Sequence, residues 1–236
     1  MTRATRRLID VVGEQFAGRD AAALITGGDV LVDGVPATSE RSQVRPGAHV
    51  SLRRTATLRG SAKLRAALAA FDVAVDGRVA LDVGAAAGGF TTVLLEAGAR
   101  LVYAVDAGHG QLLGSLRQHP RVVNLEAVNV ADLDSTNVRH RIDVVTVDVS
   151  YLSLSAATSQ LSRVALATEA VLVGLVKPMF ELRAATAPND RASLDAALAA
   201  ASEGVTAAGW SVRGSIDSPV TGGRGAREML LFAVRS

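Results

Sequence analysis

The stretch Val79-Ala80-Leu81-Asp82-Val83-Gly84-Ala85-Ala86-Ala87-Gly88-Gly89-Phe90 decides the fold of this 236-residue chain. Its apolar beginning predicts a buried strand that ends at Gly84, and a helix is expected over residues 89–97. Glycines between a strand and a helix let the backbone approach a ligand closely at the carboxyl end of a sheet. The stretch therefore predicts an α/β domain with a ligand site at one edge of its sheet.

Strands alternate with helices along the chain from residue 59 onward. Further apolar runs predict strands at residues 101–105, 122–125, 142–147, 170–176, 210–216 and 228–234. Helices are expected between them, notably over residues 153–166 and 190–208. Continuous Val and Leu strands that alternate with helices are typical of a mainly parallel sheet covered on both faces. A Gly-rich loop rather than a helix joins the last two strands, so we expect the last strand to run antiparallel.

The first 58 residues follow a different pattern. Two short helical segments, 6–16 and 19–26, precede short strands around the turn Asp33-Gly34, which is a strong hairpin signal. Nine arginines lie between Arg3 and Arg59, against six acidic residues. We therefore expect a small α+β domain over residues 1–58, followed by the α/β domain over residues 59–236.

Composition narrows the class of protein. No stretch reaches about 18 apolar residues without a charge, so no membrane span is expected. The basic start lacks a following apolar segment, so no signal peptide is expected either. Cysteine is absent and only four histidines are present, which disfavours disulfides and a metal site. These features fit a cytoplasmic protein, and the net charge of +2 indicates a nucleic-acid partner only weakly.

The basic residues are divided unevenly, because 23 of the 25 are arginine. Coding bias explains such an excess, and it makes the two remaining lysines, Lys63 and Lys177, informative. Arginine can replace lysine on most surfaces, but not where an amine must lose its proton or act as a compact charge. We therefore expect both lysines to have chemical roles.

The Gly-rich turn is similar to the acidic-x-G-x-G-x-G turn of S-adenosylmethionine (SAM) methyltransferases, with Ala86 in the middle glycine position. Asp106 ends the next strand, where a carboxylate can accept hydrogen bonds from both ribose hydroxyls, and Asn129 follows the third strand, near the adenine. A generic tight turn and an NAD site are the alternatives, whereas the missing phosphate-loop motif disfavours a nucleoside triphosphatase. The similarity implies a SAM site made of Asp82, Gly84, Ala86, Gly88, Gly89, Phe90, Asp106, Asn129 and Asp148.

Four ionisable residues complete the predicted site. Asp148 follows the fourth strand and Lys177 the fifth, so both lie at the sheet edge that carries the Gly-rich turn. Lys63 lies on the helix that leads into the domain, and Glu228 opens the last strand. Simpler interpretations are a helix cap for Asp148 and a solvated strand start for Glu228. An amine flanked by apolar residues, as Lys177 is, is costly to bury unless it is paired.

A Lys-Asp-Lys-Glu tetrad in this order resembles the FtsJ-type 2′-O-methyltransferases. Val176-Lys177-Pro178-x-Phe180-Glu181 and Arg59-Gly60-x-x-Lys63-Leu64 resemble its TlyA (hemolysin A) branch. The resemblance implies an S4-like first domain, SAM as cofactor, and methylation of cytidine ribose in ribosomal RNA, with the RNA or a ribosomal subunit as partner. It also implies that Lys177 is the base. Lys63 would orient the acceptor and favour the neutral amine of Lys177, while Asp148 and Glu228 would fix the amines.

Two other functions stay open. The first domain departs from the branch's pattern at Ala17-Gly18-Arg19-Asp20, and so does the loop after Glu181. These departures favour an enzyme of the same descent that methylates a small hydroxyl-bearing molecule in specialised metabolism. A non-catalytic RNA-binding protein is the third possibility, and the intact tetrad argues against it.

Overall fold

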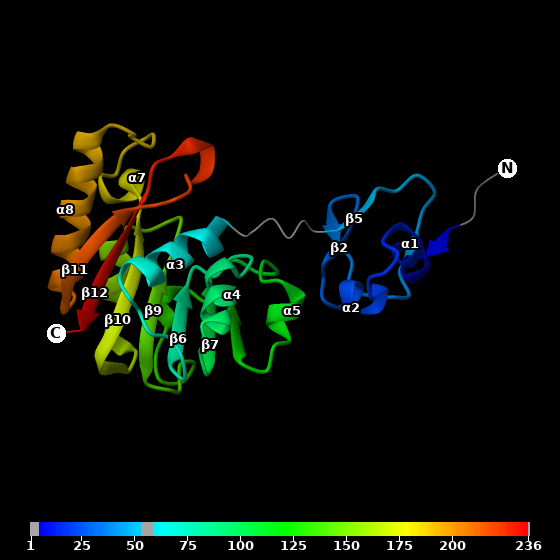
Figure 1. The fold of residues 1–236 in the computed structure, drawn as a ribbon, viewed down its shortest axis with the longest axis horizontal. Coiled ribbons are helices and arrows are strands. Elements are labelled where there is room, and N and C mark those ends of the chain that lie inside the picture. The colour runs from blue at the N-terminus through cyan, green and yellow to red at the C-terminus, as the bar shows by residue number, and fades with distance from the viewer. Residues whose placement is uncertain (1–4, 53–58, 236) are drawn as a thin grey trace. The chain divides into compact units, whose positions relative to one another are not determined.

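The computed structural model describes residues 5–52 and 59–235 (Figure 1). The chain divides into two compact units, Met1–Ala56 with Leu113–Pro120, and Thr57–Leu112 with Arg121–Ser236. The helix α5 (Gly114–Arg117) thus belongs to the first unit, although it lies between two strands of the second in the sequence. The predicted boundary between residues 58 and 59 touches residues 53–58, which lie outside the described ranges, and it stays a prediction.

The first unit is a small α+β arrangement. Its elements are β1 (Arg6–Arg7), α1 (Leu8–Gln15), α2 (Ala21–Thr26), β2 (Val30–Val32), β3 (Val35–Pro36), β4 (Gln43–Val44) and β5 (Val50–Leu52). Strands β3, β2 and β5 form one antiparallel sheet, and β1 pairs with β4. The predicted hairpin is confirmed, since Asp33 and Gly34 both have positive φ, 52° and 83°, as a tight two-residue turn requires.

The second unit is built on a seven-stranded sheet. Its strands are β6 (Val79–Val83), β7 (Leu101–Asp106), β8 (Val122–Glu126), β9 (Ile142–Val147), β10 (Leu166–Val176), β11 (Trp210–Asp217) and β12 (Met229–Arg235). Their order is β11-β12-β10-β9-β6-β7-β8. All neighbouring pairs from β10 to β8 are parallel, whereas β12 is antiparallel to both β10 and β11. The expected mainly parallel sheet with an antiparallel last strand is thus confirmed.

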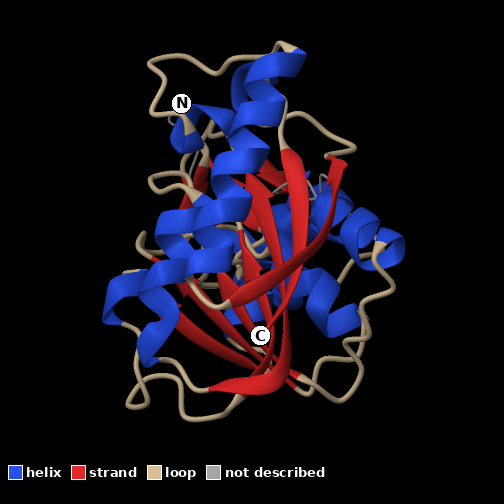
Figure 2. Ribbon diagram, turned by 90° about the vertical axis from the view of Figure 1, so that its left-hand side faces the viewer, coloured by secondary structure: helices blue, strands red, loops and turns tan. Residues whose placement is uncertain are grey.

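Helices lie on both sides of this sheet (Figure 2). They are α3 (Arg59–Ala70), α4 (Gly89–Glu96), α6 (Leu154–Ser159), α7 (Pro178–Glu181) and α8 (Arg191–Ala207). Helix α3 packs with α4, and α6 packs with α8. The helix predicted over residues 153–166 is shorter, because the chain tightens into a 3-10 turn at Gln160–Arg163 and β10 already begins at Leu166.

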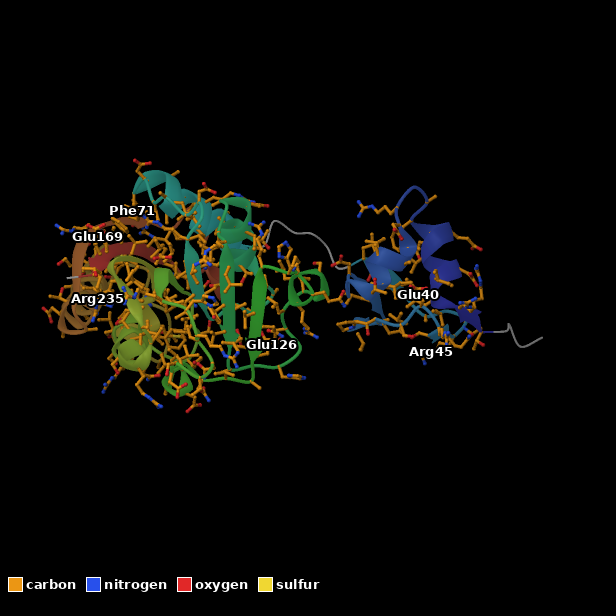
Figure 3. All side chains as sticks on the ribbon, turned by 90° about the horizontal axis from the view of Figure 1, so that it is seen from below. Glu40, Arg45, Phe71, Glu126, Glu169 and Arg235 are labelled. Carbon is orange, nitrogen blue, oxygen red and sulfur yellow. The ribbon has the colours of Figure 1, made fainter. Side chains whose placement is uncertain are left out.

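The core of the second unit follows from the strand pattern. All five residues of β6 are buried, as expected for a central strand covered on both faces. Two aromatic contacts involve β12. Phe232 stacks on Phe71 with ring centroids 5.1 Å apart, and the Arg235 guanidinium lies 5.6 Å from the centre of the Trp210 ring of β11. Phe71 and Arg235 are labelled in Figure 3. None of the described helices is long and apolar enough to cross a membrane.

Candidate active site

The Gly-rich turn is anchored by a buried carboxylate. Asp82 is fully buried and accepts hydrogen bonds from the Thr91 hydroxyl at 2.6 Å and the Thr146 hydroxyl at 2.9 Å. These bonds connect β6 to helix α4 and to strand β9. Burial raises the pKa of Asp82 to about 6, although both hydroxyls oppose the shift. Asp82 therefore lies behind the turn and holds it in place.

The turn adopts the conformation that its glycines allow. Gly84 and Gly88 have φ values of 88° and 95°, and Ala86 takes φ 45° in the position where the related turn carries glycine. Left-handed backbone of this kind disfavours a side chain. The Ala86 N–H donates to Asp106 Oδ2 at 2.8 Å, and the Gly108 N–H donates to Oδ1 at 2.7 Å. Both oxygens of Asp106 are thereby fixed at the end of β7.

A cavity of about 280 Å³ opens beside the turn. Four of the predicted cofactor residues line it, namely Gly84, Ala86, Asp106 and Asp148. Of the other five, Asp82 is buried behind it, and Gly88, Gly89, Phe90 and Asn129 are not part of its lining. Phe90 is buried and packs beside Gly60 of α3, while Val130, next to Asn129, lines the cavity instead. Binding roles for those residues stay predictions.

The four predicted catalytic side chains form one continuous chain of contacts. Lys63 Nζ lies 2.6 Å from Glu228 Oε2 and 3.9 Å from Asp148 Oδ2, and Lys177 Nζ lies 2.6 Å from Asp148 Oδ1. Lys63 and Glu228 are buried, with residue exposures of 5% and 8%. Asp148 thus lies between the two amines. The structure brings together residues from α3, from the ends of β9 and β10, and from the start of β12.

Lys177 has two further partners beside Asp148. Its amine donates to the Val149 carbonyl oxygen at 2.8 Å and to the Ser150 hydroxyl at 2.9 Å. The lysine follows β10 directly and precedes Pro178, the first residue of α7. A proline at this position fits a helix start, because the first turn leaves its N–H groups unbonded. The strand end and the short helix therefore hold Lys177 at the sheet edge.

A second cavity, of about 880 Å³, shares Asp148 with the first one. All four tetrad residues line it, together with Ser150, Met179, Phe180, Asn189, Gly222 and Arg227 among others. Asp148 and Ser150 are the two residues that line both this cavity and the first one. We call the first the turn cavity and the second the tetrad cavity. One reactant in each cavity would meet the other beside Asp148.

Glu181 has a supporting position rather than a place in the tetrad. Its carboxylate accepts the Leu154 N–H at 2.5 Å and the Ser155 hydroxyl at 3.3 Å, at the beginning of α6. Burial raises the pKa of Glu181, and these hydrogen bonds oppose the shift. The residue therefore ties the segment after Lys177 to the helix that follows Asp148.

Several residues of the turn cavity did not stand out in the sequence. Gln111, Ser150 and Tyr151 bring an amide and two hydroxyl groups to its lining. They lie in loops, where neither strand nor helix periodicity marks them. Ser150 and Tyr151 could have been suspected from the sequence, because they come shortly after Asp148 at the end of the fourth strand.

Comparison with known proteins agrees with this geometry. The FtsJ-like methyltransferase family model matches residues 57–235, which cover the turn, both cavities and the tetrad. The chain belongs to this family. It is also 43% identical over 168 residues to the 16S/23S rRNA (cytidine-2′-O)-methyltransferase TlyA of Mycobacterium tuberculosis, a match that covers 70% of the chain and 62% of that relative. The chain thus spans less than two thirds of this curated relative's length.

Two solved structures are similar to this FtsJ-like chain. A protein of Streptococcus thermophilus provisionally described as a hemolysin aligns with a TM-score of 0.72 at 28% identity, over 98% of this chain and 89% of that one. A protein of Listeria monocytogenes, provisionally described as a SAM-dependent methyltransferase, aligns with a TM-score of 0.55 at 14% identity, over 76% of this chain and 99% of that one. The second likeness concerns the fold alone. The predicted family resemblance and the predicted fold are therefore confirmed.

The donors and acceptors of the turn cavity fit SAM. The Asp106 carboxylate is held at the cavity by two backbone N–H groups, and an ionised carboxylate can accept further hydrogen bonds from ribose hydroxyls. The lining adds the Gln111 amide and the Tyr151 hydroxyl, which can bond the polar edges of a nucleoside. Gly84 and the small Ala86 bring the backbone of the turn to the cavity lining.

Proposed function

We propose that this chain is a SAM-dependent 2′-O-methyltransferase that acts on ribose in ribosomal RNA. The observation that carries the proposal is the continuous contact from Glu228 through Lys63 and Asp148 to Lys177, at the junction of two cavities. A hydroxyl is a poor nucleophile until a base engages it. Methyl transfer to a hydroxyl needs such a base next to the place where donor and acceptor meet.

Each tetrad residue has a separate task in this proposal. SAM in the turn cavity supplies a methyl group on a sulfonium. Lys177 accepts the proton of the acceptor hydroxyl, because it lines the tetrad cavity next to Asp148 and Ser150, which line both cavities, and its side chain keeps an exposure of 12%. Asp148 contacts both lysines and fixes the distance between them. Glu228 neutralises the buried charge of Lys63, which would otherwise be costly in the interior.

Cytidine in ribosomal RNA is the acceptor that the tuberculosis relative's name gives for that protein. The tetrad cavity, about 880 Å³, is large enough for a nucleotide. Met179 and Phe180 add apolar surface to it, on which a base can pack. We further propose that the first unit is S4-like and contributes to RNA binding, which would place the protein with ribosomes in the cytoplasm. Its Arg7, Arg19 and Arg41 are exposed.

The test is transfer of labelled methyl groups from SAM to naked ribosomal RNA, isolated subunits and assembled ribosomes. We expect label in at least one of these RNAs, and nuclease digestion should recover it as 2′-O-methylcytidine. The Lys177→Arg protein, which keeps the charge but cannot accept a proton, is the matched control. Label in base methyl groups, or in small metabolites of an extract but in none of the RNAs, would contradict the proposal. The second outcome would support the small-molecule alternative.

A further inference from the structure

Among the residues that the structure describes, the Lys177 amine has three polar neighbours, and only one of them carries a hydrogen of its own. Asp148 Oδ1 and the Val149 carbonyl oxygen, at 2.6 Å and 2.8 Å, are pure acceptors. The Ser150 hydroxyl, at 2.9 Å, can accept a hydrogen bond or donate one. An ammonium has three hydrogens, so the protonated lysine satisfies all three neighbours at once.

The neutral amine has two hydrogens and one lone pair. Neither Asp148 nor Val149 can face that lone pair favourably, because both present oxygen lone pairs of their own. The two hydrogens must therefore stay on Asp148 and Val149, and the lone pair points at Ser150. The direction from which Lys177 can receive a proton is thus the direction that the Ser150 hydroxyl occupies.

Ser150 is also placed where an acceptor hydroxyl would be. It lines both the turn cavity and the tetrad cavity, a position it shares only with Asp148 among their described lining residues. Unlike the buried Lys63 and Glu228, Ser150 is exposed. Its hydroxyl can therefore contact a ligand in the tetrad cavity and Lys177 at the same time.

We propose that Ser150 is a catalytic residue that relays the acceptor's proton to Lys177. The proposal rests on the proposed function. As the acceptor oxygen forms its bond to the methyl carbon, the carbon–sulfur bond of the methyl donor breaks. The acceptor proton moves to Ser150 Oγ, and the hydroxyl proton of Ser150 moves to Lys177 Nζ. Ser150 ends as a hydroxyl, Lys177 as an ammonium, and the sulfur product is neutral, so charge and atoms balance.

Magnetic resonance tests the contact without any cofactor or acceptor. Lys63 and Lys177 are the only lysines in the sequence, so lysine labelled with ¹⁵N at Nζ and ¹³C at Cε gives two side-chain signals. The Lys63→Arg protein assigns them. Ser150→Ala should shift the Lys177 signal and leave that of Lys63 nearly in place. Ser159→Ala is the matched control, because its hydroxyl donates to the Ala156 carbonyl oxygen within its own helix. A Lys177 signal that ignores Ser150→Ala overturns the relay.

Single-turnover kinetics with saturating SAM and RNA test the chemistry. Ser150→Ala should slow methyl transfer about 10²-fold, at the lower end of the range for loss of a general base. Because SAM and RNA are saturating, a change in either affinity does not enter this rate, and Ser150→Thr, which keeps a hydroxyl, should restore most of it. Wild-type speed in Ser150→Ala, or a slow Ser150→Thr protein, overturns the relay alone. A wild-type protein that methylates no RNA overturns the proposed function, and the relay with it.

Discussion

The backbone of Asp148 runs so close to Gly84 that a Cβ atom on residue 84 would lie 2.4 Å from the Asp148 carbonyl oxygen. The Asp148 N–H also donates to the Val83 carbonyl oxygen at 2.9 Å. The turn that lines one cavity and the carboxylate that joins the two lysines are therefore positioned by the same backbone contact.

The first prediction concerns this contact. Gly84→Ala should destabilise the fold, because φ 88° alone costs about 1–2 kcal/mol for a residue with a Cβ, and the clash with Asp148 adds to it. Gly77→Ala is the matched control, since Gly77 has φ 70° and nothing within 4 Å of an added Cβ. Urea unfolding measures both. Equal losses of stability in the two variants would show that the clash between the added Cβ and Asp148 does not destabilise the fold.

The second prediction concerns Asp106. Asp106→Ala should weaken SAM binding by about 1.5–3 kcal/mol for each lost hydrogen bond to the carboxylate. It also releases the N–H groups of Ala86 and Gly108, which the carboxylate now holds. Isothermal calorimetry measures the affinity, and Asp132→Ala, which removes an exposed carboxylate outside the turn cavity, is the control. Unchanged affinity in the Asp106 variant would refute the site assignment.

The third prediction separates the two lysines. Lys177→Arg should lower the single-turnover rate by about 10²–10⁴-fold, since a guanidinium cannot accept the proton. Lys63→Arg should instead lower the free energy of unfolding by about 1–3 kcal/mol. Lys63 is buried between Glu228 and Asp148, and the larger guanidinium overfills that space. Thermal melts and SAM titrations accompany both variants. Near-normal turnover by Lys177→Arg would mean that Lys177 is not the base.

The fourth prediction uses the raised pKa of Asp82. Between its unfolded value near 3.8 and its folded value of about 6, the native protein keeps a proton that the unfolded chain loses. The contribution of Asp82 to the free energy of unfolding is therefore fully present below about pH 4 and is lost as the pH rises through 6. The loss amounts to about 3 kcal/mol in all. Asp82→Asn removes this titration. The stability of the variant relative to wild type should rise by up to that amount between about pH 4 and pH 7.5. Urea unfolding at both pH values measures this. A difference in free energy of unfolding between the variant and the wild type that is the same at both pH values would contradict the prediction.

The fifth prediction concerns RNA binding by the first unit. Arg7 and Arg41 are exposed and form no ion pair within residues 5–52 and 59–235. If both contact phosphates, the double variant Arg7→Ala with Arg41→Ala should weaken RNA binding and reduce the salt slope by about 1 per contact. Its SAM affinity serves as the control. An unchanged slope would remove these two arginines from the RNA interface.

The sequence predicted the sheet and the tetrad for a common physical reason. Central parallel strands are buried on both faces, so their Val and Leu runs are continuous and easy to recognise. Residues that follow such strands, as Asp148 and Lys177 do, necessarily meet at one edge. Glu228 was harder, because its place depends on the direction of β12, which the Gly-rich loop only suggested.

Loop residues escaped prediction because long-range contacts fix them. Nothing local distinguishes Ser150 from other serines, since its importance comes from Lys177, 27 residues away. Val130 was not predicted and lines the turn cavity at the start of a 3-10 turn, while its neighbour Asn129 is exposed and its cofactor role stays a prediction. The two-residue strands β1 and β4 are too short for any periodicity to reveal them.

Strand β12 lies inside the sheet, between β11 and β10, although it is the last strand in the sequence. It places Glu228 2.6 Å from Lys63, 165 residues earlier. During synthesis, a chain whose β12 is still inside the ribosome therefore lacks the strand that lies between β10 and β11. In such a chain Lys63 also lacks its partner Glu228. The tetrad can form only after translation of this domain is nearly finished, so a partly synthesised chain lacks the complete set of tetrad contacts.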